Sequence, residues 1–246
     1  MKLKIYIQSN NKIKVPYGFS EYLQALIYNF LDRISAEWLH ENGFSYEKRK
    51  FKLFVYSSFL EKPLKINKEK KEFVFPGRVC FIISSPLDWL IKQVAQNIVI
   101  SEEISIGKNS GFVSGVEIIP EEKIDKSRIR INALSPIEVH STHTDNEGVK
   151  KTRYYAPTET EFSKMVNENQ HKKWKALLNE DCPYNLSIKP VKSDLCKKQV
   201  RKFKNTIIEG YTGHYYIEGD SDFLNFAVST GLGSRNSGGF GMVEIV

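Results

Sequence analysis

The chain has 246 residues, enough for one large domain or two of ordinary size. Its composition is 41% hydrophobic and 26% charged, which is typical of a globular protein and excludes a disordered or fibrous one. The 36 Lys and Arg residues outnumber the 29 Asp and Glu residues, so the formal net charge is +7, and a polyanion such as nucleic acid would gain from that field. No apolar run approaches the roughly 20 residues that cross a bilayer, and the lysine-rich start lacks a signal-peptide core, so we expect no membrane partner.

The first half of the chain predicts elements in the order β-α-β-β-α-β. Alternating apolar and polar residues indicate strands, and apolar residues at helical spacing indicate helices. The predicted elements are a strand over 2–8, a helix begun by Ser20 with an apolar stripe to Ile34, a short helix over 35–41 ended by Asn42 and Gly43, strands over 51–59 and 72–84, a helix opened by Ser85 and Pro86 and running to Ile98, and a strand over 112–119.

The second half predicts the same order. Its elements are a strand over 128–134, a helix opened by a Thr158–Glu161 capping box and running to Leu178, strands over 184–191 and 200–209 with a continuation over 215–217, a helix begun by Asp220, and a strand over 241–246. Polar residues near 120–127 separate the halves. The predicted fold is therefore α+β, with two tandem ferredoxin-like (RRM-like) domains, 1–122 and 123–246, packed side by side. A single mixed α+β domain is the alternative.

A glycine-rich segment, 231-GLGSRNSGGFGMVEIV-246, is the sharpest local signal in the sequence. It is preceded by a predicted helix and followed by a strand, so it is not a dinucleotide fingerprint, and it lacks the G-K-[ST] of a P-loop. Its glycines, with Arg235 and Asn236 between them, suit close approach of a phosphate. A loop whose glycines only allow tight packing is the alternative. The stretch 239-GFGMV-243 partly matches an RNA-recognition signature, but Met242 stands where an aromatic residue should stack.

A run of cations precedes this segment, in 189-KPVKSDLCKKQVRKFKN-205. Such a run predicts a track for phosphates, and the alternative is a solvated edge strand whose lysines oppose aggregation. The cations are Lys189, Lys192, Lys197, Lys198, Arg201, Lys202 and Lys204.

Few residues make a catalytic pattern. His140 and His143 form H-x-x-H without a second ligand pair, and there is no carboxylate cluster of the kind that holds two metal ions. The three cysteines form neither an even disulfide framework nor a CxxC pair, which favours a reducing cytoplasm. His40 is the remaining candidate, because it lies in the last turn of a short predicted helix, where the helix dipole favours an imidazolium. A surface or capping histidine is the alternative.

The chain resembles a known family at several places. The stretches 15-VPYGFSEYLQALIYNFL-31, 38-WLHENGF-44, 51-FKLFVYSSF-59, 133-ALSPIEV-139 and 231-GLGSRNSGGFGMV-243 are similar to the CRISPR-associated endoribonucleases of Cas family six, which cut repeat RNA transcripts. The glycine-rich segment is shared by the wider RAMP superfamily.

The resemblance implies a metal-independent endoribonuclease that uses no cofactor and processes CRISPR repeat RNA into guide crRNAs. It implies catalytic roles for Tyr28, His40 and Lys52, with Lys48 or Lys50 as substitutes for Lys52. The expected chemistry is attack of a 2′-hydroxyl on the adjacent phosphate, leaving a 2′,3′-cyclic phosphate and a 5′-hydroxyl. The residues expected to bind RNA are the seven cations of 189–204 together with Gly231, Gly233, Ser234, Arg235, Asn236, Gly239 and Gly241.

Two other functions are consistent with the sequence. One is a non-catalytic RAMP subunit that binds RNA within a CRISPR interference complex, and the other is a plain tandem RNA-binding module. Convergence of Tyr28, His40 and Lys52 near one phosphate would distinguish the enzyme from the subunit. Association with a CRISPR effector complex and homodimerisation are further possibilities that the sequence does not decide.

Overall fold

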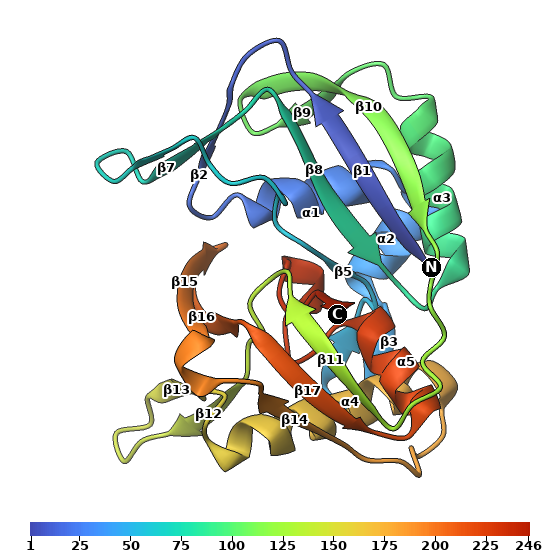
Figure 1. Ribbon diagram of the computed structural model, residues 1–246, viewed down its shortest axis with the longest axis vertical. Helices are drawn as coiled ribbons and strands as arrows, with labels where there is room; N and C mark the ends of the chain where they lie inside the picture. Colours follow the sequence, from blue (N-terminus) through green and yellow to red (C-terminus); the bar gives the residue numbers. More distant parts are fainter.

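The alternating start of the chain forms the centre of the first sheet. In the computed structural model, which describes all 246 residues, β1 (Lys2–Gln8) lies between β8 (Arg78–Ser84) and β10 (Asn109–Ile119), with β5 (Val55–Tyr56) and β9 (Ile104–Ile106) at the edges (Figure 1). Every pair is antiparallel. The apolar side chains of β1 are buried in one core with those of α1 (Ser20–Asn29) and α3 (Asp88–Val99). The order β5-β8-β1-β10 is that of a ferredoxin-like domain.

The second sheet repeats this arrangement with later segments of the chain. Its order is β14 (Leu186–Pro190), β17 (His214–Gly219), β11 (Arg128–Ala133) and β18 (Val243–Ile245), again antiparallel throughout. The helices α4 (Thr160–Leu178) and α5 (Ser221–Thr230) contribute to its core. The predicted α+β fold of two tandem ferredoxin-like domains packed side by side is therefore confirmed, and Figure 1 shows the first domain above the second.

One small three-stranded sheet and three hairpins lie outside the two main sheets. They are β2 (Ile13–Pro16) with β7 (Glu72–Phe75) and β6 (Lys65–Asn67), β3 (Phe44–Tyr46) with β4 (Arg49–Phe51), β12 (His140–Thr144) with β13 (Lys150–Tyr154), and β15 (Lys197–Phe203) with β16 (Thr206–Thr212). Figure 1 shows β15 and β16 rising from the second domain toward the first. The backbone of Lys202 lies so close to Gly18 that a Cβ there would be 2.6 Å from a carbonyl oxygen.

Three predicted strands are divided in the structure. The strand predicted over 72–84 breaks at Pro76 and Gly77 into β7 and β8, which pair with different partners, because proline has no N–H to continue a ladder. The strand predicted over 51–59 is interrupted at Leu53, whose φ is +53°. The strand predicted over 200–209 turns back at Lys204, whose φ is +52°, and becomes the β15–β16 hairpin.

The bounds and caps of two helices also differ from the prediction. The first helix ends at Asn29, and Asp32 caps a separate helix, α2 (Arg33–Glu41), by accepting a hydrogen bond from the backbone N–H of Ser35 at 2.9 Å. The predicted Thr158 capping box is wrong, because the cap residue of α4 is Glu159. The Glu159 carboxylate accepts instead from the Ala156 N–H at 2.6 Å. Asp220 caps α5 as predicted.

The glycine-rich segment connects the domains. It leaves α5, turns through a short 3₁₀ helix, η2 (Asn236–Gly238), and returns along the first sheet to β18. Met242 is buried in a small apolar cluster with Val55 and Ile82 of the first domain. The Met242 N–H donates to the Ser135 hydroxyl at 2.9 Å. None of the helices has the length and apolar character needed to cross a membrane.

The tight path of this segment leads to a stability prediction. Gly241 has φ +78°, and a Cβ there would lie 1.9 Å from the Leu232 carbonyl oxygen, whereas Gly148 has φ +79° and open space around it. Both alanine variants pay about 1–2 kcal/mol for the left-handed conformation. Only Gly241→Ala must also displace buried backbone. We expect it to lose at least ~3 kcal/mol more unfolding free energy than Gly148→Ala in urea denaturation. Equal losses would show that the segment relaxes freely.

Candidate active site

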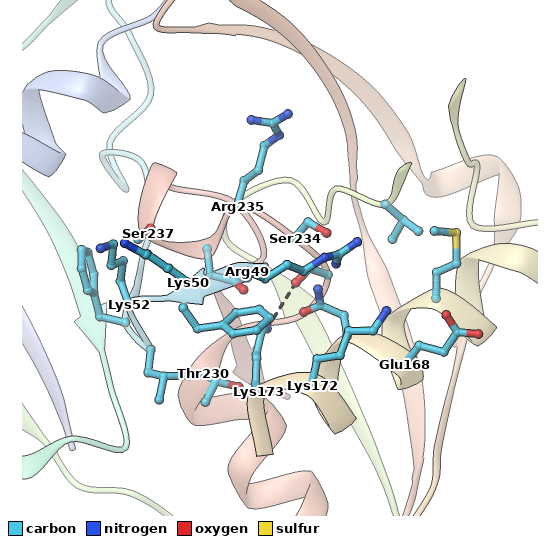
Figure 2. A pocket seen from close by; sticks show the side chains of 18 of the residues that line it. Arg49, Lys50, Lys52, Glu168, Lys172, Lys173, Thr230, Ser234, Arg235 and Ser237 are labelled. Carbon is cyan, nitrogen blue, oxygen red and sulfur yellow. Dashed lines mark hydrogen bonds between the residues drawn. The ribbon is translucent and has the colours of Figure 1, made fainter. Parts of the chain in front are cut away.

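A cavity of about 400 Å³ lies between the two domains and is strongly basic. Figure 2 shows that its charged side chains come from three separate segments: the β4 region, α4 and the glycine-rich segment. Glu168 is the one acidic side chain in the lining. The cations that line it are Arg49, Lys50, Lys52, Lys172, Lys173 and Arg235. Lys173 is buried beneath the lining, and the positive field of the other five would attract phosphate groups.

Of the three residues expected to act in catalysis, Lys52 lines this cavity and binds the end of α2 that carries His40, whereas Tyr28 and His40 are not among the lining residues. Tyr28 lies in the last turn of α1, His40 in the last turn of α2, and Lys52 directly after β4. The rings of Tyr28 and His40 have centroids 6.1 Å apart and meet edge to face. The ammonium group of Lys52 donates to the backbone carbonyls of Leu39 and His40. The imidazole of His40 is exposed, so it is open to a ligand.

Lys52 and Lys50 both bind the carboxyl end of α2. The Lys50 ammonium donates to the Glu41 carbonyl at 2.5 Å, next to the carbonyls that Lys52 binds. Gly43 lets the chain turn here, with φ +56° and an ideal Cβ only 2.6 Å from the Phe51 carbonyl oxygen. Cations at this end of a helix are favourable, but they also occupy the negative pole that we expected to favour a charged His40. Lys50 and Lys52 therefore share this end of α2 with the His40 side chain.

Burial changes the acidity of the other two groups. Desolvation raises the pKa of the half-buried Tyr28 phenol to about 12, so the phenol keeps its proton near neutral pH. Burial, and secondarily the neighbouring Lys50 ammonium, lowers the pKa of Lys52. Tyr28 is thus suited to donating a hydrogen bond, and Lys52 presents a partly desolvated ammonium group.

The glycines of the glycine-rich segment are more buried, and more of their N–H groups are hydrogen-bonded within the protein, than we expected. Gly231, Gly233, Gly239 and Gly241 are all buried. The N–H of Gly239 donates to Asn236 and that of Gly241 to Pro136, so these two groups are not free to bind a phosphate. The buried Asn236 amide donates to the carbonyls of Leu232 and Phe240 at 3.1 and 3.0 Å. Tight packing, the alternative that we considered, describes the glycines, whereas Arg235 is exposed and Ser234 half-buried at the cavity.

Sequence reasoning missed the residues of α4 that support this segment. The Lys173 side chain is fully buried, and its ammonium donates to the carbonyls of Gly231 at 2.6 Å and Gly233 at 3.2 Å. Gln170, also buried, donates to the same Gly231 carbonyl at 2.7 Å. On α4 both residues fall on the helix face that meets the glycine-rich segment, a placement that no local motif signals.

A second missed contact holds Arg235. The Glu138 carboxylate is fully buried and lies 2.5 Å from the Nδ1 atom of His140, and its other oxygen is 3.9 Å from the Nε atom of Arg235. His140 therefore contacts a buried carboxylate beside the cavity. No group of three or more metal-ligating side chains gathers anywhere in the protein.

The seven cations of 189–204 do not share one surface. Lys198 is paired with Glu209 at 2.7 Å. Arg201 is turned inward and donates to the Ser58 hydroxyl of the first domain at 2.8 Å. The remaining five, Lys189, Lys192, Lys197, Lys202 and Lys204, are exposed. The partial RNA-recognition signature presents no stacking ring, because Phe240 and Met242 are both buried.

Two ferredoxin-like domains with a basic cavity and a glycine-rich connection between them define a RAMP-type architecture. Comparison with protein families identifies the particular one. The model for "CRISPR associated protein Cas6, C-terminal" matches residues 119–245, and that for "CRISPR-associated protein Cas6, N-terminal" matches residues 14–117. The chain belongs to the Cas6 family.

Relatives and solved structures agree with this assignment. The chain is 28% identical to the CRISPR-associated endoribonuclease Cas6 1 of Methanocaldococcus jannaschii over 99% of this chain and 92% of the relative. It is 24% identical to the CRISPR-associated endoribonuclease Cas6 of Pyrococcus furiosus, over 94% and 84%. A solved "CRISPR associated protein Cas6" superposes with a TM-score of 0.79 at 25% identity, covering 100% of this chain and 99% of that one. A structure described as "An RAMP protein binding different RNA substrates" has the same fold, with a TM-score of 0.83 at 19% identity, over 100% and 99%.

The buried ammonium of Lys173 gives a pH prediction. Burial lowers its pKa well below 10.5, so between that lowered value and 10.5 the unfolded chain binds more protons than the folded one. Stability therefore rises with pH across this window. We expect the unfolding free energy of the wild-type protein to rise relative to that of Lys173→Met by up to about 1.4 kcal/mol per pH unit. Urea denaturation of both proteins at pH 7 and at pH 9.5 measures this difference. Parallel stability curves would mean that the ammonium is as well solvated in the fold as outside it.

Proposed function

We propose that this protein is an endoribonuclease that cleaves CRISPR repeat RNA without a metal ion. The observation that carries the proposal is the edge-to-face contact of Tyr28 with His40, next to Lys52, which binds the His40 carbonyl and lines a basic cavity. Relatives named CRISPR-associated endoribonuclease Cas6 support it, because their similarity spans nearly the whole chain. A solved structure described as a Cas6 product complex shares the fold, with a TM-score of 0.70 at 15% identity.

The proposed reaction is internal transesterification of RNA. A 2′-hydroxyl oxygen attacks the adjacent phosphorus and the bond to the 5′-oxygen breaks, which leaves a 2′,3′-cyclic phosphate and a 5′-hydroxyl. The reaction needs removal of the 2′-hydroxyl proton, stabilisation of the phosphorane oxygens and a proton for the leaving oxygen. Each need can be met by a group at this site or by solvent.

The acidity of each group suggests its role. A phenol is protonated at neutral pH, and burial raises the pKa of Tyr28 further, so Tyr28 orients the 2′-hydroxyl by hydrogen bonding rather than acting as the base. His40, exposed beside Tyr28, accepts the 2′-hydroxyl proton. The Lys52 ammonium stabilises the phosphorane oxygens, where a preorganised cation has its largest effect. The leaving oxygen is protonated from solvent.

The same geometry favours the enzyme over the non-catalytic subunit. A subunit that only binds RNA needs cations and a groove, but it has no need of a phenol in contact with an imidazole, or of an ammonium group held on the backbone of that same histidine. The tandem RNA-binding module has less support, because the aromatic and methionine side chains of its signature are buried.

The function is tested by incubating the protein with CRISPR repeat RNAs in excess EDTA. Each RNA is paired with a copy that carries a 2′-deoxy group on the upstream side of the cut. We expect one cut in EDTA that the deoxy substitution abolishes, with a cyclic phosphate on the upstream product. Tight binding without a cut would support the subunit, and cleavage that requires added Mg²⁺ would refute the mechanism.

Substitutions at the site test the individual roles. We expect His40→Ala to slow cleavage by about 10²–10⁴-fold without weakening RNA binding. Lys52→Ala should lose about 10²–10³-fold in single-turnover rate, as removal of one oxyanion donor does elsewhere, because it removes charge from the phosphorane. Lys50→Ala is its matched control, since it also removes an ammonium from the end of α2. A larger loss for Lys50→Ala would exchange the roles of the two lysines.

A modified leaving group distinguishes a base from an acid at position 40. RNA with sulfur in place of the bridging 5′-oxygen releases a thiolate, which needs no proton. If His40 is the base, His40→Ala remains slow on this substrate. Recovery of the rate toward that of the wild-type protein would make His40 the acid that protonates the leaving oxygen.

A further inference from the structure

A second cavity, of about 420 Å³, opens between hairpins of the two domains at the amino-terminal end of α1, the end away from Tyr28. The first domain supplies the residues around β2, β6 and β7, and the second supplies β15. The strands of these hairpins do not pair with any strand of the two main sheets. The cavity is therefore formed only because the β15–β16 hairpin reaches across the domain boundary.

The floor of this cavity is aromatic. The rings of Tyr17 and Phe73 have centroids 4.7 Å apart and are half-buried, so part of each borders the opening. Phe19 stacks on Phe59 at 5.1 Å, and Phe75 meets Phe59 edge to face at the same distance. A continuous group of rings of this kind offers a planar apolar ligand a surface on which to stack.

An arginine without an acidic partner borders the same cavity. The Arg201 guanidinium donates to the Ser58 hydroxyl at 2.8 Å and to the Gln199 side-chain oxygen at 3.0 Å, which leaves further N–H groups unused. Burial lowers the pKa of Arg201 to about 10, so the group remains charged at neutral pH. Half-buried charges are usually paired, and the partners of this one are both neutral.

Other polar groups stand at the edge of the rings. Glu61 uses one carboxylate oxygen to accept the Cys80 N–H at 2.8 Å and keeps the other. The Ser20 hydroxyl is buried and finds no partner within the protein. Hydrogen-bond donors and an acceptor are thus placed beside an apolar floor, which matches the flat face and polar edge of a nucleobase.

The surroundings of the opening are both apolar and basic. Ile66 on β6 and Val200 on β15 line it from the two domains and are 52% and 59% exposed. Exposed lysines stand on both hairpins, with Lys65 on the first and Lys197 and Lys202 on the second. The rim is therefore able to hold the phosphates on either side of a bound base.

We propose that this cavity binds one unpaired base of the RNA substrate. The base stacks on the aromatic floor, and its polar edge is read by Arg201 and Glu61. The proposal rests on the proposed function for the identity of the RNA. Ser20 borders this cavity, and Tyr28 belongs to the proposed catalytic group. The two residues are eight positions apart on α1, so they are separated by about 12 Å along the helix axis. At about 3.4 Å per stacked nucleotide, the bound base lies roughly three or four nucleotides from the cut, or fewer if the strand is extended.

An apolar protein segment is the other ligand that rings could bind. A half-buried guanidinium without an acid and a rim of lysines would oppose a neutral apolar segment, since binding it would cover the charge without pairing it. A nucleotide supplies both a ring and a phosphate. The charge of the cavity thus favours RNA.

The test is an abasic scan of a repeat RNA made uncleavable by a 2′-deoxy group at the cut. We expect one abasic position to weaken binding to the wild-type protein by about 5–150-fold, the usual range for loss of one stacked base. With Arg201→Ala, intact RNA should bind more weakly, and the same abasic position should change affinity less than about twofold. Arg128→Ala is the control, because it removes an arginine that pairs with Glu218 on the second sheet, and it should keep the full abasic effect.

A second variant covers the case in which Arg201→Ala loosens the hairpin. Val200→Asp places a negative charge at the mouth of the cavity on an exposed position, and we expect it to suppress the abasic effect as well. The proposal would be overturned if no abasic position weakened binding to the wild-type protein. It would also be overturned if the sensitive position had the same effect in both variants as in the wild-type protein. Cleavage of intact RNA in EDTA is measured on the same preparations. If the protein cleaves RNA but no abasic position weakens binding, only the base pocket is refuted. If one abasic position weakens binding but the RNA is not cleaved, only the nuclease activity is refuted.

Discussion

The geometry of the basic cavity depends on the hydrogen bonds that the buried carbonyl oxygen of Gly231 accepts. It accepts hydrogen bonds from both Gln170 and Lys173 of α4, and Lys173 also binds the Gly233 carbonyl. These bonds fix where the glycine-rich segment leaves α5. From there the segment crosses to the first domain, where Met242 packs against Val55 and the Gln24 side chain donates to the Ser237 carbonyl at 2.5 Å. Arg235 therefore lines the same cavity as Lys52 because α4 holds the backbone that precedes it.

Charge in this region is organised by neutral partners more than by ion pairs. Lys52, Lys50 and Lys173 all bind backbone carbonyls, and the inward guanidinium of Arg201 binds a hydroxyl and an amide. A carbonyl positions a cation without cancelling its charge. The site thus keeps a strong positive field while its side chains are held in place, a combination that suits a phosphate with developing negative charge.

The order of elements could be predicted from the sequence, because burial on one face of a sheet or helix produces a visible period. Asp220 and the Asn42–Gly43 helix stop were local signals and were predicted correctly. The turn at Lys204 was missed, since a lysine with positive φ gives no turn signature. The catalytic group was proposed through family resemblance, and the cavity could not be predicted at all: Arg49, Lys172 and Arg235 are far apart in sequence and meet only through the packing of the two domains.

The hairpins that form the aromatic cavity have an evolutionary consequence. Ile66, Gln199, Val200 and Arg201 lie on hairpins outside the two main sheets, whereas Tyr28, His40 and Lys52 depend on α1, α2 and the core of the first domain. Substitutions on the hairpin rims can accumulate without disturbing either core or the groups near the cut. With the proposed base pocket and the proposed catalytic group on separate parts of the fold, recognition of a repeat sequence can change under selection independently of cleavage.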